Sequence, residues 1–220
     1  MASVEAFYGR WADLYDHIAT LPGVARWRQR AAERVADRGA TIVEMGCGTG
    51  ANLPFLREQV GPEGRVVGID ITRPLLDRAR TRASEYDNVA VLHGDAVVPP
   101  VASADGVLAT FVCGLFENPE RVVDQWCDRL NDGGRVALLD ATPSEQPLGV
   151  PLNPLFSMFV AAGSPTTDAR DVLRAPCSGH GTELERRVAA SRRALAARAR
   201  DRRYETFGLG FVGLASGRID

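Results

Sequence analysis

Apolar residues recur every three or four positions over residues 3–37, a spacing that predicts helices. Pro22-Gly23 divides this stretch into two helices, and Gly39 is expected to end the second one, as glycine commonly does just past a helix. The next segment, Thr41 to Met45, is short, apolar and β-branched, and glycines follow it at once. It predicts a buried strand that leads into a tight turn.

Beyond this first strand, apolar runs alternate with helical patterns. We predict strands over residues 65–70, 89–95, 106–112 and 135–140, helices over 74–84 and 120–130, and a turn at 132–134. Such alternation predicts a parallel sheet with helices on both faces. Residues 204–218 alternate weakly around Gly208-Leu209-Gly210 and predict two closing strands. The predicted fold class is α/β: a doubly wound, Rossmann-like sheet of about seven strands, mostly parallel, with an antiparallel C-terminal hairpin.

Two segments interrupt the alternation. Residues 141–181 contain six prolines and one short apolar piece, 155–160, which the prolines are expected to keep out of any regular element. Residues 182–203 predict a helix with one apolar stripe and eight arginines on its other faces. We therefore expect one domain, organised as a helical cap (1–38), a cofactor-binding core (40–140), a lid-like insertion (141–181) and a closing helix with strands (182–220).

Composition excludes several kinds of protein. All 26 basic residues are arginine, so chemistry that needs a lysine amine, such as a phosphate loop or a Schiff base, is excluded. The net charge of -2 gives no general attraction to nucleic acid. The four cysteines lack the C-x-x-C spacing of zinc sites, so we expect no metal. Neither a signal peptide nor a membrane-spanning run is visible, which favours a cytoplasmic protein.

The strongest chemical signal is a glycine loop. Gly46, Gly48 and Gly50 directly follow the first predicted strand, and only glycine lets a backbone turn so sharply and approach a ligand so closely. The N-terminus of the next helix offers unpaired N–H groups for an anion. With Ala51, however, the same loop satisfies the dinucleotide fingerprint, and Asp70 could hold ribose hydroxyls under either interpretation.

Further motifs favour one interpretation. The motif Glu44-x-Gly46-x-Gly48-x-Gly50 resembles motif I of class I S-adenosylmethionine-dependent methyltransferases, and Gly94-Asp95-Ala96 resembles their adenine-side acidic motif. Residues 130–135 are similar to their turn before the fifth strand, and residues 204–215 to their terminal hairpin. Residues 7–16 and 114–118 look closest to the quinone-biosynthesis C-methyltransferases and the phospholipid N-methyltransferases. The resemblance is strong over residues 40–140.

The resemblance implies S-adenosyl-L-methionine as the cofactor. The three glycines of the loop, with Cys47 between them, would hold its methionine part. Glu44 would lie near its amino group, and Asp70 would accept both ribose hydroxyls.

The same resemblance implies an adenine site and a reaction site. Ile71 would pack on the adenine, and Asp95 with Ala96 would recognise its edge. Phe111, after the fourth strand, would lie near the sulfonium.

The sequence leaves the catalytic group open. Methyl transfer is an in-line displacement, which an enzyme accelerates mainly by alignment and by excluding water. A base is needed only where the acceptor must first lose a proton. Tyr15 and His17 beside the first helix and Glu117 beyond the fourth strand are candidates, although His17 could be a surface or cap residue and Glu117 a helix-entry residue.

We expect methyl transfer to a small, lipophilic acceptor such as a quinol or a lipid head group, because the insertion supplies an apolar piece. The arginine-rich helix would allow peripheral contact with an anionic membrane, or it could be a solvated outer helix. The alternatives are an NAD-type Rossmann oxidoreductase and a non-catalytic cofactor-binding module. An oxidoreductase would normally need a further substrate domain.

Overall fold

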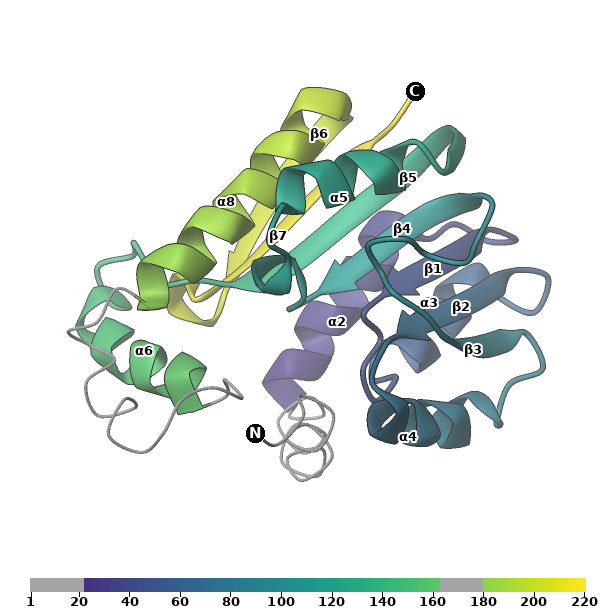
Figure 1. Ribbon diagram of the computed structural model, residues 1–220, viewed down its shortest axis with the longest axis horizontal. Coiled ribbons are helices and arrows are strands. Elements are labelled where there is room, and N and C mark those ends of the chain that lie inside the picture. The colour runs from purple at the N-terminus through teal and green to yellow at the C-terminus, as the bar shows by residue number, and fades with distance from the viewer. Residues whose placement is uncertain (1–21, 163–179) are drawn as a thin grey trace.

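The computed structural model describes residues 22–162 and 180–220, and a seven-stranded sheet in the order β3-β2-β1-β4-β5-β7-β6 lies at its centre (Figure 1). The first five strands pair in parallel, and the last two are antiparallel. The predicted fold class is confirmed. The strands are β1 (Thr41–Met45), β2 (Arg65–Asp70), β3 (Val89–His93), β4 (Ala104–Thr110), β5 (Leu130–Ala141), β6 (Arg200–Phe207) and β7 (Val212–Arg218).

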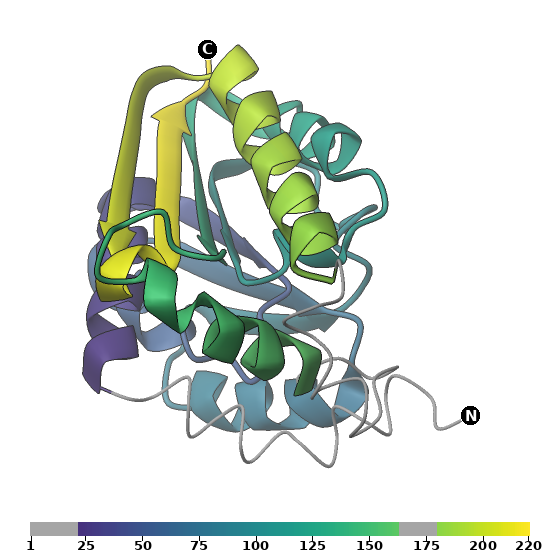
Figure 2. The same ribbon diagram turned by 90° about the vertical axis from the view of Figure 1, so that its left-hand side faces the viewer.

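Helices cover both faces of the sheet (Figures 1 and 2). One face carries α2 (Pro22–Val35), α3 (Leu53–Val60) and α4 (Arg73–Ala83), and the other carries α5 (Pro119–Cys127) and α8 (His180–Arg198). Three 3-10 turns, η1 (Cys113–Leu115), η2 (Val150–Leu152) and η4 (Gly208–Gly210), and the helix α6 (Asn153–Ala162) complete the described elements. The first predicted helix falls outside the described residues.

Each face of the sheet buries its own apolar layer. Leu53, Leu56 and Leu76 of α3 and α4 are fully buried on one side. On the other side, Trp126 of α5 and Leu195 of α8 pack together against the sheet. This double burial explains why the parallel strands are nearly continuous apolar runs, as the sequence indicated.

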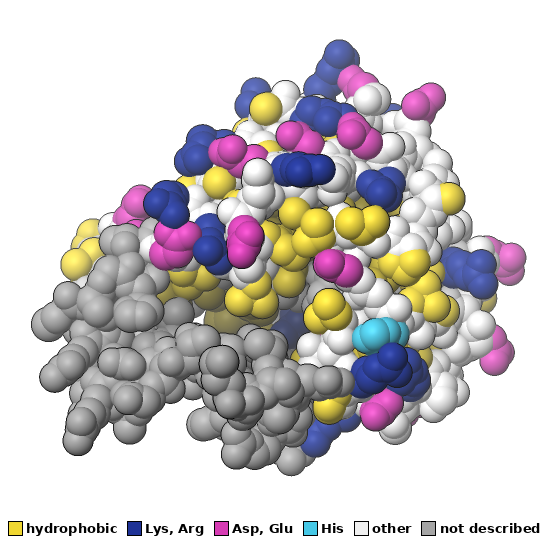
Figure 3. Space-filling model, viewed as in Figure 1, with side chains coloured by type: hydrophobic (Ala, Val, Ile, Leu, Met, Phe, Trp, Pro, Cys, Tyr) yellow, Lys and Arg dark blue, Asp and Glu magenta, His cyan; other side chains and the backbone are white. Residues whose placement is uncertain are grey.

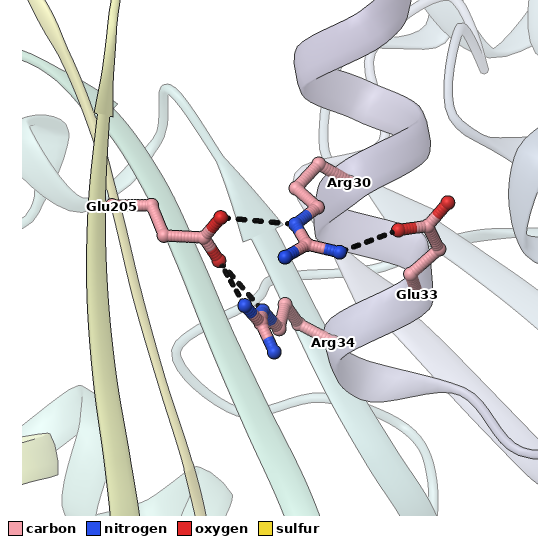
Figure 4. A network of polar contacts seen from close by, with 4 residues as sticks. All are labelled: Arg30, Glu33, Arg34 and Glu205. Atoms are coloured by element: carbon pink, nitrogen blue, oxygen red, sulfur yellow. Dashed lines mark hydrogen bonds and ion pairs between the residues drawn. The ribbon is translucent and has the colours of Figure 1, made fainter.

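Ion pairs fix α2 against the edge strand β6 (Figure 4). Glu205 of β6 accepts a hydrogen bond from Arg30 Nε at 2.9 Å and one from Arg34 Nε at 2.7 Å. Arg30 also pairs with Glu33 of the same helix. The ion pairs thus add a link to the edge strand to the apolar packing of Ala31, Ala32 and Val35 of α2 on the core.

Two predicted boundaries in the middle of the chain are wrong. Residues 132–134 do not precede the fifth strand as a turn: β5 already begins at Leu130, with an irregular pairing and a left-handed Gly133 (φ 77°) inside it. The apolar piece 155–160 belongs to the helix α6, although prolines were expected to prevent this. Pro154 lies in the first turn of that helix, where no intrahelical N–H bond is lost.

The arginine-rich helix is shorter than predicted. Its expected apolar stripe is confirmed at Val188, Ser191 and Leu195, which are all buried. However, α8 ends at Arg198, and residues 200–203 belong to the strand β6. Asp201 takes a left-handed conformation (φ 49°), and Arg200 already pairs with Arg218 of β7. Sheet pairing thus overrides the high helix propensity of the three arginines in residues 200–203.

Within the described ranges, 22–162 and 180–220, no helix is both long and apolar enough to cross a lipid bilayer.

Candidate cofactor site

The glycine loop connects β1 to α3, and its three glycines are needed for different reasons. All three have positive φ, between 54° and 79°. A Cβ at Gly46 would come within 2.8 Å of Val112, and one at Gly50 would meet Leu53 at 2.8 Å. A Cβ at Gly48 would meet no atom of residues 22–162 or 180–220 within 4 Å. Gly46 and Gly50 therefore allow close packing, whereas Gly48 faces open space that a ligand could fill.

Asp70, at the end of β2, holds the loop in place. One carboxylate oxygen accepts a hydrogen bond from Gly48 N at 2.9 Å, and the other accepts one from Thr72 N at 2.8 Å. Each carboxylate oxygen has two lone pairs, so both retain capacity for a further donor such as a hydroxyl. The side chain is partly exposed, as contact with a ligand requires.

Glu44, at the carboxyl end of β1, is completely buried in a polar network. Asn52 donates from its amide nitrogen to one oxygen of Glu44 and also to Thr110 Oγ1, the latter at 2.9 Å. The carbonyl oxygen of Asn52 in turn accepts from Arg28 Nη1 at 2.9 Å. The second oxygen of Glu44 is also buried, and it has no hydrogen-bond partner among the described residues.

The electrostatics of Glu44 follow from this burial. Desolvation disfavours the carboxylate and raises the pKa of Glu44 from 4.5 to about 7. The hydrogen bond from Asn52 and the charge of Arg28 act in the opposite direction, while the nearby charge of Asp70 raises the pKa further. An unpartnered oxygen on a buried acid is costly unless a donor or a cation satisfies it.

The loops after β2 and β3 form the adjoining part of the site. The Ile71 side chain is 62% exposed, which is unusual for a large apolar residue. The exposed Asp95 accepts a hydrogen bond from Val97 N at 2.8 Å, and Ala96 is nearly buried. Trp126 of α5 donates to Ala96 O at 2.7 Å and fixes this loop. The carboxyl ends of the adjacent strands β1 and β2 thus bring together four of the predicted site residues: Glu44, Gly48, Asp70 and Ile71.

Phe111 follows β4 directly, at the same edge. Its φ is 57°, a conformation that bulky residues rarely adopt and that tends to mark functional positions. Phe111 N donates to Leu139 O at 2.7 Å, so the turn is fixed to β5. The ring is 37% exposed, and the Arg28 guanidinium lies 5.7 Å from its centroid.

The catalytic candidates are only partly described. Tyr15 and His17 lie outside the described residues. Glu117 is exposed, just before α5. The adjacent Asn118 caps this helix, because its side chain accepts a hydrogen bond from Arg121 N at 3.3 Å. A role for Glu117 as a base stays a prediction.

Sequence reasoning missed three members of the network, Arg28, Asn52 and Thr110. Arg28 sits among the apolar positions of α2 and is only 7% exposed, and Asn52 is 1% exposed. An arginine on the apolar stripe of a helix was the available signal, because such a residue must find a buried partner. The partner itself could not be identified from spacing, since Arg28 and Asn52 are separated by a whole strand.

The residues at this edge fit an adenosine-containing cofactor with a positively charged amino group. The space over Gly48 admits a ligand chain, the unpartnered oxygen of Glu44 suits an ammonium group, and Asp70 suits hydroxyls. The exposed side chain of Ile71 suits a flat ring.

Comparison with known proteins agrees with this geometry. The methyltransferase domain family matches residues 42–134, which include the glycine loop, Asp70, Asp95 and Phe111. These residues form a methyltransferase domain. The match agrees with the resemblance of the motifs to class I S-adenosylmethionine-dependent methyltransferases.

Curated relatives cover part of the chain. The 2-phytyl-1,4-naphtoquinone methyltransferase of Thermosynechococcus vestitus is 33% identical over 64% of this chain and 65% of its own length. The demethylmenaquinone methyltransferase of Lactococcus lactis is 30% identical over 56% of this chain and 50% of its own length. The arsenite methyltransferase of Halobacterium salinarum is 32% identical over 59% of this chain and 34% of its own length. The chain thus spans between a third and two thirds of the length of these relatives.

A solved structure shares the fold over almost the whole chain. A SAM-dependent methyltransferase from Aquifex aeolicus superposes with a TM-score of 0.59, at 18% identity, over 95% of this chain and 98% of that one. At this identity the likeness concerns the fold alone.

Proposed function

We propose that the protein transfers a methyl group from S-adenosyl-L-methionine to a small, lipophilic acceptor, with a quinol or a lipid head group favoured. The observation that carries the proposal is the open space over Gly48 beside the unpartnered oxygen of Glu44, both at the carboxyl edge where ligands of such sheets bind. The cofactor, when bound, supplies an electrophilic methyl group.

The residues of this chain would then bind and orient. Glu44 would face the ammonium group, Asp70 the ribose hydroxyls, and Ile71 with Asp95 and Ala96 the adenine. Rate acceleration would come mainly from alignment and from keeping water out, so no nucleophilic side chain is required.

An apolar rim supports a lipophilic acceptor. Large apolar side chains that follow β2, β3 and β4 are unusually exposed for such residues. They are Ile71 (62%), on which the adenine would pack, and Val98 (67%), Phe111 (37%) and Leu115 (61%), which would remain for the acceptor. Figure 3 shows hydrophobic side chains gathered on this face over η1 and α5, beside a hollow. Two of the relatives are named for quinones, which are hydrophobic ring compounds.

Methyl transfer from labelled S-adenosylmethionine tests the acceptor class. The purified protein would be incubated with the lipid extract and, separately, with the aqueous metabolites of the same cells. We expect label in the lipid extract, and none with a Gly48→Val variant. Label confined to a polar metabolite would refute the lipophilic acceptor, and absence of transfer to any fraction would favour a non-catalytic module.

Peripheral contact with an anionic membrane is a weaker part of the proposal. Most described arginines of α8 already have acidic partners: Arg186 and Arg187 pair with Glu183, and Arg193 pairs with Glu120. Arg198 lies 2.8 Å from Asp128. Since paired charges attract a surface less, we expect vesicle binding only at low salt, measured by co-sedimentation. Full binding at high salt would contradict an electrostatic contact.

A further inference from the structure

Arg28 joins α2 to two parts of the candidate site. Its guanidinium donates to Asn52 Oδ1 at 2.9 Å and lies 5.7 Å from the Phe111 ring centroid. The residue is 7% exposed, so this charge is held away from solvent. The ion pairs of Arg30 and Arg34 with Glu205 hold the same helix against β6. The position of the Arg28 guanidinium is thus fixed from several sides.

Asn52 connects this arginine to Glu44. An asparagine amide accepts through its oxygen and donates through its nitrogen, so it can transmit an orientation from a donor to an acceptor. Here the oxygen accepts from Arg28, and the nitrogen donates to Glu44 and Thr110. Asn52 thus binds one carboxylate oxygen of Glu44, and the other oxygen is the one without a partner among the described residues.

The charged groups around Glu44 are few. Arg28 from α2 favours its carboxylate, and Asp70 from β2 disfavours it. The Cys47 thiol lies near both acids, and burial together with their charges keeps its pKa raised, so it remains neutral. Arg28 is therefore the cation that offsets the desolvation of Glu44 in the described structure.

We propose that Arg28 is a positioning residue for the cofactor: acting through Asn52, it holds Glu44 as a charged, oriented partner for the cofactor's ammonium group. This inference rests on the proposed function. Arg28 need not touch the cofactor, and its effect is specific to the amino-acid end, because Asp70 and Ile71 bind the other end without it.

Two ligands separate this role from a general loss of structure. S-adenosylhomocysteine carries the ammonium group, and 5′-methylthioadenosine has the adenosine without the amino acid. We expect Arg28→Met to raise the dissociation constant of S-adenosylhomocysteine by about tenfold or more, because a buried charge loses its support. Its affinity for 5′-methylthioadenosine should change little. Calorimetry gives both dissociation constants.

The pH profile is the second readout. Without Arg28 the Glu44 carboxylate is harder to form, so we expect the S-adenosylhomocysteine affinity of Arg28→Met to recover partly between about pH 7 and about pH 8.5. Asn52→Leu should reproduce the selective loss, because it breaks the connection and leaves the arginine. Arg28→Lys should retain part of the affinity. Arg26→Met, at an exposed arginine of the same helix, is the matched control and should bind as the unmodified protein does.

The outcomes distinguish the proposals. If the unmodified protein binds neither ligand, the proposed function fails. If it binds both, and Arg28→Met and Asn52→Leu weaken both ligands equally or neither, the positioning role of Arg28 is refuted while the function stands. Circular dichroism on each variant identifies unfolding, and Arg28→Lys keeps the test informative should Arg28→Met not fold.

Discussion

Two buried acids lie near the carboxyl ends of parallel strands, Glu44 in β1 and Asp140 in β5, with β4 between them. Both are almost fully buried, and each has one carboxylate oxygen without a hydrogen-bond partner in the part of the chain that the structure describes. Burial raises the pKa of Glu44 to about 7 and that of Asp140 to about 6, and a helix arginine opposes the shift in each case, Arg28 or Arg192.

The surroundings of the two acids differ. Beside Glu44 lies the glycine loop, with open space over Gly48. Asp140 instead lies beside the buried Cys113 of η1 and near Arg192 of α8. Arg192 donates to the Tyr204 hydroxyl at 3.0 Å rather than to Asp140. A buried acid therefore indicates a ligand site only where the adjoining backbone leaves room for a ligand.

The largest effect is expected from filling that room. Gly48→Val should abolish S-adenosylhomocysteine binding, because the side chain would enter the open space. Gly39→Val is the matched control: Gly39 also has positive φ (78°) and nothing within 4 Å of a Cβ, but it lies before β1. Both variants should lose a similar ~1–2 kcal/mol of stability from backbone strain. Unchanged binding by Gly48→Val, measured by calorimetry, would show that the loop is only structural.

The second-largest effect is expected from neutralising Glu44, whereas neutralising Asp140 should leave cofactor binding almost unchanged. Glu44→Gln removes the charge that would face the cofactor. It should make the binding free energy of S-adenosylhomocysteine less favourable by about 1–3 kcal/mol. Asp140→Asn should change the affinity for S-adenosylhomocysteine by less than about 0.5 kcal/mol, since Asp140 lies on β5, two strands away from the strand that leads into the glycine loop. Titration calorimetry on the two variants checks this, and equal losses would remove the distinction between the acids.

Both acids should make the free energy of unfolding of the ligand-free protein depend on pH. An acid whose pKa is raised on folding keeps its proton where the unfolded chain has lost it, so the free energy of unfolding falls as pH rises. The fall should span pH 4.5 to about 7 for Glu44 and pH 3.8 to about 6 for Asp140. Each contributes up to about 3 kcal/mol.

Urea unfolding across this range measures the effect. Glu44→Gln should flatten the upper part of the curve and Asp140→Asn the lower part. Saturating S-adenosylhomocysteine should reduce the Glu44 contribution alone, because its ammonium group favours the carboxylate. A stability that rises with pH over the same interval, in both the unmodified protein and the variants, would contradict the assignment.

The smallest effect concerns the ion pairs that orient α2. Glu205→Gln should lower the free energy of unfolding by about 0.5–1 kcal/mol, the usual value for partly exposed pairs. Asp77→Asn, which breaks the exposed pair with Arg80, should cost less. Thermal unfolding in low and high salt compares the two variants, and a loss for Glu205→Gln no greater than that for Asp77→Asn would show that the pairs do not orient α2.

Much of the fold could be predicted because parallel strands with two buried faces are apolar throughout. Helix and strand boundaries were less predictable. The piece 155–160 is helical because Pro154 sits in a first turn, and Asn153 exchanges hydrogen bonds with Ser144, a contact that spacing does not reveal. The end of α8 is set by pairing of β6 with β7, which local propensity cannot express.

The candidate site was predictable in part for a similar reason. Its glycines lie in one contiguous motif and Asp70 ends the next predicted strand, so the sequence locates them. Arg28 and Thr110 reach Asn52 only because α2 and β4 converge on α3, and such contacts depend on tertiary packing. Contacts between distant segments leave no periodic signal in one sequence.

The most direct measurement is a comparison of S-adenosylhomocysteine with NADH by calorimetry on the unmodified protein at near-neutral pH. We expect a one-to-one complex with S-adenosylhomocysteine in about the micromolar range. We expect no measurable heat with NADH, because the acid Glu44 would oppose a pyrophosphate at the glycine loop. Tighter binding of NADH than of S-adenosylhomocysteine would contradict the account at its centre.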